Sequence, residues 1–245
     1  MIDNVANIIN FDGYEINFYN GATDDDIIQF IDLDRIVYPE NYQISHKIIQ
    51  RWNEKNPNLY CVAKDVHKNK VIGYMGFFPL TEDMFIESLQ IDFDENHIAP
   101  EHVERYERSG IYYLYINSVV VSPDFQKYPV VYGNIFGTFL NSVIELASND
   151  IFFCDACGRA TSEEGAKQCR SLLRMKEVAS DDTSGLRIFH SKLLPMGMRL
   201  PFDAGRKIYN LFSEKYESIG RKSVGLEDVA AVLRSPARRS AASNA

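Results

Sequence analysis

The sequence predicts a mixed α/β (α+β) fold, a central sheet flanked by helices, followed by a helical C-terminal extension. Short runs rich in aromatic and β-branched residues alternate with runs that repeat apolar residues at helical spacing. Beyond Leu194 the character of the chain changes, and basic and small residues become more frequent. With 245 residues, of which 45% are hydrophobic, the chain is long enough for one large domain with its own core.

The N-terminal third predicts a strand, two helices and a hairpin. Residues 14–19 alternate as a strand does. A helix is expected to begin after Thr23, whose hydroxyl can cap it. The three aspartates that follow suit the positive end of the helix dipole. A second helix is expected over 45–55 and is ended by the Asn-Pro-Asn that follows. The runs 59–64 and 71–80 are strand-like and predict a hairpin.

The rest of the domain predicts strands and helices in alternation. Residues 112–121 form the most strongly β-forming run of the chain, and residues 133–147 carry apolar residues around a wide helical face. The later elements are expected at 151–157 (strand), 162–174 (helix), 175–179 and 186–193 (strands). In the extension, which we place at 195–233, we expect an amphipathic helix over 202–219 and a short helix over 226–233, and then a disordered tail over 234–245.

The overall composition excludes several classes of protein. A net charge of −8 argues against general nucleic-acid binding, which depends on basic surface. The N-terminus has neither the basic start nor the apolar core of a secretory signal, and no uninterrupted apolar run approaches the ~20 residues that cross a bilayer. Four cysteines do not make a disulfide scaffold. We therefore expect a cytoplasmic protein that does not bind membranes.

Residues 119–126, Val-Val-Val-Ser-Pro-Asp-Phe-Gln, resemble the central strand and turn of the GNAT N-acetyltransferase superfamily. Residues 160–167 with 175–178 resemble the second helix and following strand of that family, and residues 14–27 resemble its opening strand and helix. The resemblance covers residues 12–194. It implies a GNAT-like domain in which two parallel strands splay apart to hold acetyl-CoA, and an enzyme that transfers the acetyl group to an amine without a metal.

The resemblance implies a donor site along the central strand and the helix after it. Pantetheine would pair with the backbone of Val119, Val120 and Val121, and the pyrophosphate would lie at the next helix N-terminus. The phosphate-binding candidates are Gln126, Lys127, Tyr128, Val130, Val131, Tyr132, Gly133 and Asn134. The chain departs from the family's Gln/Arg-x-x-Gly-x-Gly/Ala pattern, because Pro129 and Val131 replace its small residues and proline has no N–H to donate.

The expected acid and base residues are also absent. Asn117 lies near the position of the family's glutamate base, and Arg170, beside Cys169, lies at the position of its tyrosine acid. The substitutes that we consider for catalysis are Tyr115, Asn117, Asp155 and Cys169. Tyr115 can equally be a core aromatic residue, and Asp155 a hydrogen-bonding group at a strand end.

An acidic insertion over residues 81–109 precedes the central strand. It holds nine acids and two arginines, and we expect a helix over 100–108. By the resemblance, this loop lies on the acceptor side, so its acids would favour a cationic small molecule or a peptide amine. Glu82 and Glu87 are the substrate-binding candidates, from the set Glu82, Asp83, Glu87, Asp92, Asp94 and Glu95. The alternative is a solvated surface insertion.

Cys154 and Cys157 have the spacing of a metal or redox pair, but no second pair accompanies them. Because residues three apart on a regular strand point to opposite faces, we expect their thiols to diverge and predict no metal site.

Two other functions stay open at this point. The chain could be a catalytically degenerate GNAT-like module that binds or regulates. Alternatively, the basic extension could dock a partner or a second copy of the chain, forming a homodimer.

Overall fold

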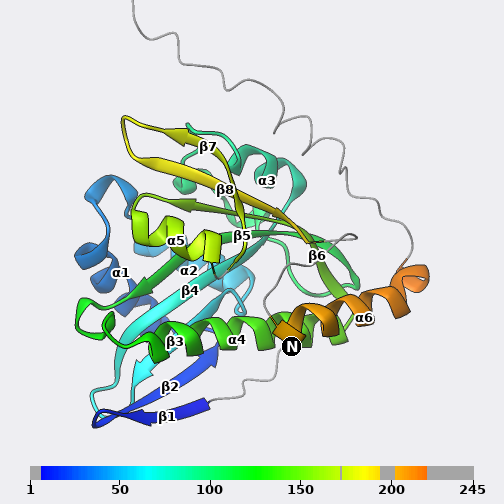
Figure 1. Ribbon diagram of the computed structural model, residues 1–245. Coiled ribbons are helices and arrows are strands. Elements are labelled where there is room, and N and C mark those ends of the chain that lie inside the picture. The colour runs from blue at the N-terminus through cyan, green and yellow to red at the C-terminus, as the bar shows by residue number, and fades with distance from the viewer. Residues whose placement is uncertain (1–6, 172, 194–201, 220–245) are drawn as a thin grey trace, which may run out of the picture.

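Eight strands form one sheet in the order β1-β2-β3-β4-β5-β6-β8-β7 (Figure 1). The computed structural model describes residues 7–171, 173–193 and 202–219. The strands are β1 (Asn7–Phe11), β2 (Tyr14–Asn20), β3 (Tyr60–Asp65), β4 (Lys70–Leu80), β5 (Gly110–Val121), β6 (Ile151–Ala160), β7 (Lys176–Asp181) and β8 (Leu186–Lys192). The mixed sheet and the order of its strands confirm the fold class that the sequence predicts.

Helices cover both faces of this sheet. The α-helices are α1 (Asp24–Val37), α2 (His46–Lys55), α3 (Glu82–Ser88), α4 (Pro129–Ser148), α5 (Glu163–Ser171) and α6 (Phe202–Ile219). Short 3₁₀ helices are η1 (Glu40–Tyr42), η2 (Glu95–His97), η3 (Pro100–His102) and η4 (Pro123–Phe125). Side chains of α1, α2 and α3 enter one hydrophobic core, and those of α4, α5 and α6 enter the other.

The sheet begins before residue 12, the start expected from the sequence. Strand β1 pairs antiparallel with β2 through a turn at Asp12 and Gly13, both of which have positive φ. Asn7, Ile8 and Asn10 are exposed, so this edge strand lacks the alternation of buried residues by which strands are recognised in a sequence.

Strand β5 is the centre of the sheet and the origin of its mixed character. It runs antiparallel to β4 and parallel to β6. The parallel ladder ends at the pair Ile116 and Gly158. Beyond it, β5 stays paired with β4 as far as Val121, while β6 continues against β8. The two parallel strands therefore part, as the resemblance implies.

A β-bulge lies where the two strands part. Gly76 of β4 pairs with Ser118, and Phe77 pairs with Ile116, so Asn117 is the extra residue. A Cβ atom at position 76 would lie 3.3 Å from the Cβ of Asn117 and 3.3 Å from the ring of Tyr60, which is tighter than ordinary packing. The absence of a side chain at Gly76 makes room for the bulge, and bulges redirect side chains at functional sites.

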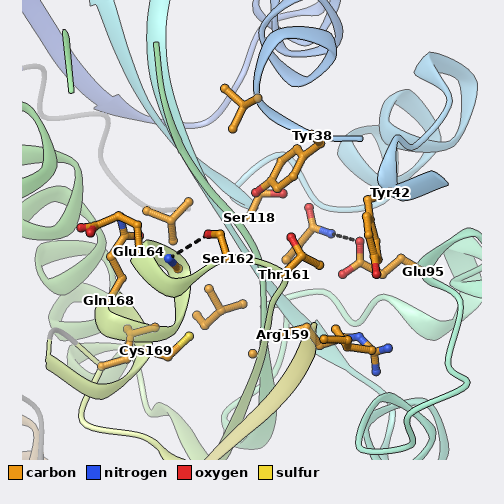
Figure 2. Close-up of a pocket in the computed structure, with 18 of the residues that line it drawn as sticks. Tyr38, Tyr42, Glu95, Ser118, Arg159, Thr161, Ser162, Glu164, Gln168 and Cys169 are labelled. Carbon is orange, nitrogen blue, oxygen red and sulfur yellow. Dashed lines mark hydrogen bonds between the residues drawn. The ribbon is translucent and has the colours of Figure 1, made fainter. Parts of the chain in front are cut away.

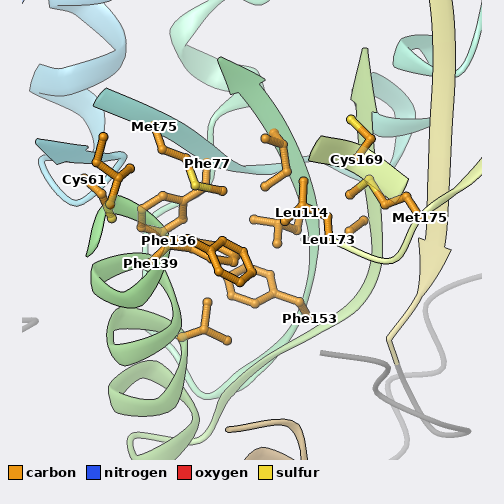
Figure 3. Packing of buried hydrophobic residues seen from close by; sticks show 14 of the residues in the cluster. Cys61, Met75, Phe77, Leu114, Phe136, Phe139, Phe153, Cys169, Leu173 and Met175 are labelled. Carbon is orange, nitrogen blue, oxygen red and sulfur yellow. The ribbon is translucent and has the colours of Figure 1, made fainter. Parts of the chain in front are cut away.

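The core between the sheet and α4 is dense and aromatic (Figure 3). The ring of Phe139 on α4 meets that of Phe77 on β4 edge-on, with centroids 5.2 Å apart. By length and composition α4 could cross a membrane, and it is the one such helix in the described part of the chain. Here the sheet covers one side of α4 and α6 lies along another (Figure 1).

Two local predictions were wrong. Residues 103–108 are not helical, because the backbone at Val103 bridges to Leu80 at the end of β4: the N–H of Thr81 donates to the carbonyl of His102 at 2.9 Å and that of Glu104 to the carbonyl of Pro79 at 2.7 Å. The thiols of Cys154 and Cys157 do not diverge to opposite faces. The register between β5 and β6 shifts at Cys154. This shift breaks the alternation of side chains along β6 and places both thiols in the same core.

Helix α6, the described part of the extension, contributes side chains to the domain core. Helix α6 has the bounds that the sequence predicts, and it packs along α4 with Ile208 and Phe212 buried. The ring of Phe212 meets that of Phe152 on β6, with centroids 5.2 Å apart. The expected helix over 226–233 and the disordered tail over 234–245 lie outside the described residues, so they stay predictions.

Shortening Phe212 should therefore destabilise the whole domain. We expect Phe212→Ala to lower the free energy of unfolding by about 3 kcal/mol, because a buried ring is replaced by a cavity. Urea denaturation measures this. Tyr209→Ala on the same helix is the control, since Tyr209 is 45% exposed, and it should change stability by about 0.5 kcal/mol or less. If Phe212→Ala lowered the free energy of unfolding no more than Tyr209→Ala does, α6 would not stabilise the sheet.

Candidate active site

A cavity of about 350 Å³ opens where β5 and β6 part (Figure 2). Its walls come from four parts of the chain: the end of β5 with the start of α4, the end of β6 with α5, the end of α1 with η1, and residues 93–96 of the acidic insertion. Parallel strands leave unpaired backbone groups where their ladder stops, so this cavity has a polar floor that a ligand can reach.

Glu95 is the central group of the cavity. The hydroxyl of Tyr115 donates to Glu95 Oε1, and Asn117 Nδ2 donates to Glu95 Oε2 at 3.1 Å. Burial raises the pKa of Glu95 to about 7, against the opposing effect of the hydrogen bond from Tyr115 and the positive charge of Arg159. A carboxylate with this pKa is well suited to accept and release a proton near neutral pH.

Arg159 on β6 ties the acidic insertion to the sheet. Its Nη1 donates to the carbonyls of Ser88 and Gln90 at 3.2 and 2.7 Å. Its Nη2 donates to those of Ile91 and Phe93 at 3.1 and 3.2 Å. One guanidinium thus fixes the segment that leads directly into Glu95. Nothing in the sequence marks Arg159 for this role, because it stands there as a single basic residue beside a glycine.

Tyrosines close the cavity on the side of α1. Tyr38 hydrogen-bonds with the side chain of Ser118 on β5, and burial raises the pKa of Tyr38, so its phenol stays protonated. Behind it Asp34 accepts a hydrogen bond from Tyr74 at 2.6 Å, and burial raises the pKa of Asp34 to about 7. Figure 2 places Tyr38, Tyr42 and Glu95 across the cavity from Glu164 and Gln168.

The predicted donor residues are divided among three environments. Val119, Val121, Gln126 and Tyr132 line the cavity. Val120 and Val131 are buried in the two cores, and Val130 is half-buried against one of them. The others lie on the outside at the start of α4: Lys127, Tyr128, Gly133 and Asn134, of which Asn134 donates to the carbonyl of Val130 at 2.7 Å.

The predicted catalytic residues also lie in different places. Tyr115 and Asn117 hold Glu95. Cys169 lines the cavity, and burial raises its pKa to about 12, which keeps it a thiol. Asp155 lies outside the cavity, where its Oδ1 bonds His190 Nε2 at 2.7 Å.

The two substrate-binding candidates of the insertion do not line the cavity. Glu82 accepts from the hydroxyl of Tyr113 at 3.2 Å, and Glu87 is exposed. The insertion residues that do line it are Phe93, Asp94, Glu95 and Asn96. Among the described residues, no group of three or more His, Cys, Asp or Glu side chains is arranged to hold a metal ion.

Comparison with known proteins finds similar structures without similar sequences. No family model and no curated protein matches the chain. It is similar to Arabidopsis thaliana NAA60 in complex with acetyl-CoA, with 14% identity over 72% of this chain and 99% of that one and a TM-score of 0.46. It is also similar to the GphF GNAT-like decarboxylase in complex with isobutyryl-CoA, with 11% identity over 72% and 98% and a TM-score of 0.48.

A third similar structure is the loading GNATL domain of CurA from Lyngbya majuscula, with 13% identity over 62% of this chain and 68% of that one and a TM-score of 0.46. The topology of the chain itself has the arrangement that the resemblance implies: a central strand with a bulge at Asn117 and a parallel neighbour that leaves it after Gly158. A fold does not fix an activity, so the function has to be argued from the cavity.

Removing the guanidinium of Arg159 should release the insertion. We expect Arg159→Met to lower the free energy of unfolding by about 3 kcal/mol, because four carbonyls lose a charged donor. Limited proteolysis should cut residues 88–97 faster than in the unchanged protein. The control is Arg170→Met, which removes a half-exposed ion pair with Glu177 and should cost about 1 kcal/mol or less. Unchanged proteolysis in the Arg159 variant would contradict the anchoring role.

Proposed function

We propose that the chain is an N-acyltransferase that moves an acyl group, acetyl being the simplest, from a CoA thioester to an amine. One observation carries the proposal: Glu95, with a pKa near 7, is held by Tyr115 and Asn117 beside the gap between β5 and β6. A buried carboxylate with a pKa near neutrality, in a cavity with unpaired backbone groups, is the arrangement that proton transfer requires.

The reaction needs no intermediate on the protein. The nitrogen of a neutral amine attacks the thioester carbonyl, and the oxygen that becomes negative accepts hydrogen bonds from free N–H groups of β5. Glu95 takes the proton that the nitrogen loses. The carbon–sulfur bond then breaks, and the thiolate receives a proton from the phenol of Tyr38. The products are an amide and CoA. Solvent then takes the proton from Glu95 and returns one to Tyr38.

The structure weakens the reading of the chain as a degenerate module. That alternative depended on Pro129 and Val131 in the phosphate loop, on the missing tyrosine acid, and on Asn117, which lies near the position of the base and cannot accept the proton of an amine. In the structure Asn117 donates to Glu95, so the carboxylate reaches the central strand from the insertion rather than from the strand itself. The fold therefore has a base at this position although the strand does not encode one.

For the acceptor, we infer a cationic amine on a small molecule or a peptide. Asp94 and Glu95 line the cavity beside Tyr38, Tyr42 and Phe93, and carboxylates with aromatic walls favour cations. Asp34 lies close enough for the charge of Glu95 to raise its pKa. A cytoplasmic setting and a homodimer stay predictions from the sequence, as does the absence of general nucleic-acid and membrane binding.

Glu95→Gln tests the base. We expect kcat/KM to fall by about 10²–10⁴-fold, because Gln keeps the size of the side chain but takes no proton. In the unchanged protein kcat/KM should rise with pH and level off above about pH 7, since only ionised Glu95 accepts a proton. An amine that is itself neutral at pH 6 isolates this limb from the titration of the acceptor.

Glu87→Gln is the matched control, since it removes an exposed acid from the same insertion and should leave kcat/KM within about twofold. The variant at position 95 should lose the limb near pH 7 as well as its rate. A full pH limb in Glu95→Gln would show that another group is the base. Equal losses in both variants would point to an effect of overall charge.

Tyr38→Phe tests the acid. It should lower kcat by about 10-fold to 100-fold with little change in the KM of the amine, because the hydroxyl acts on the leaving thiolate. Donors with better leaving thiols should reduce this loss, since their thiolates need less help from an acid. The control is Tyr42→Phe on the same wall, which should change kcat by about threefold or less. A loss that is the same for all leaving groups would assign Tyr38 a structural role only.

A further inference from the structure

The donor end of the cavity has few groups that could bind phosphate. CoA presents a pyrophosphate and a 3′-phosphate, and proteins bind such groups with converging backbone N–H groups and basic side chains. The cavity runs from Glu95 along β5 to Gln126, Tyr132 and the start of α5. An acyl arm that lies along β5 with its thioester at Glu95 therefore brings its far end to the N-termini of α4 and α5.

Several backbone groups at the start of α4 cannot donate to an anion. Pro129 is the first residue of the helix and has no N–H. The N–H of Gln126 donates to the carbonyl of Ser122, that of Tyr128 to Phe125, and that of Val131 to Tyr128, at 3.1, 3.0 and 3.0 Å. The turn and the helix that follows it therefore use three of the N–H groups that a phosphate would need.

The charged residue that lines the cavity at this end, among the described residues, is an acid. Of the described residues that line the cavity, Arg159 is the one Lys or Arg, and four carbonyls bind its guanidinium at the other end. Glu164 lines the donor end, with Lys167 Nζ 3.8 Å from its carboxylate.

Outside the cavity, at the start of α4, the hydroxyl of Tyr128 donates to Asp12. Lys127 is fully exposed there and lies over the ring of Tyr128, 4.9 Å from its centroid. Each lysine at the donor end therefore lies near an acid: Lys167 near Glu164, and Lys127 near Asp12.

We propose that this chain recognises its acyl donor through the pantetheine arm, and that the nucleotide phosphates of CoA contribute little to binding. This rests on the proposed function for the place of the thioester, and it adds which part of the donor the chain recognises. The arm has the amides and apolar carbons that the β5 backbone, Val119 and Val121 can meet. The nucleotide half of CoA would meet Glu164 and the start of α4, where several N–H groups are already bonded.

Calorimetry with the full chain tests this with pantetheine, 4′-phosphopantetheine and CoA as separate ligands. We expect the dissociation constants of CoA and pantetheine to agree within about threefold, and to change little between 50 and 300 mM salt, because phosphate contacts would add a salt-dependent gain. CoA binding more than about tenfold tighter than pantetheine overturns the proposal. Phosphopantetheine shows which phosphate is responsible in that case. The absence of binding by both ligands at millimolar concentration overturns it as well.

Two variants sharpen the result. Glu164→Gln should bind CoA about threefold more tightly and leave pantetheine unchanged, because a repelling charge is removed. Lys127→Ala should change the CoA affinity by less than about twofold. A tenfold loss of CoA affinity in either variant overturns the proposal.

The affinities are measured without turnover. Binding without acyl transfer to any amine therefore removes the proposed function, while the ratio of the two affinities still decides how the donor is recognised.

Discussion

The structure of the site depends on the end of the hydrogen-bond ladder between β5 and β6. Up to Ile116 and Gly158 the two strands pair with each other, and beyond them each keeps only the partner on its other side, β4 for β5 and β8 for β6. Buried backbone groups must be paired, so an unpaired strand edge inside a protein is either filled by side chains or kept for a ligand. Here the space holds a cavity of about 350 Å³, which indicates the second outcome.

The acidic insertion and the sheet supply complementary parts of the site. The strand β5 provides Tyr115 and Asn117, which can only donate to and orient a carboxylate, and the insertion provides Glu95. Placing the proposed base on a separate segment requires an anchor, because a loop of 29 residues loses much entropy when it is ordered. The four bonds of Arg159 to its backbone provide that anchor, and the indole of Trp52 and the amide of Asn56 hold its later part.

The fold was predictable from the sequence because strands, caps and helical faces are local. Thr23 caps α1 through the box with Asp26, and α6 has the predicted bounds. The site was less predictable, because it depends on contacts far apart along the chain. Asn117 was noticed as a residue that cannot act as a base, but its partner lies 22 residues away among nine acids of one insertion. Only the bulge at Asn117, which follows from pairing with Gly76, selects Glu95 from that set.

One electrostatic property connects the two ends of the cavity. Asp94, Glu95 and Glu164 line it, and the charge of Arg159 is directed to carbonyls of the insertion. A field of this sign raises the concentration of cations and lowers that of polyanions. The same acids would favour the cationic acceptor that we propose and disfavour the phosphates of a CoA donor. Such a donor would have to be held by groups that are insensitive to charge, and hydrogen bonding along β5 with apolar contacts to Val119 and Val121 would meet that requirement.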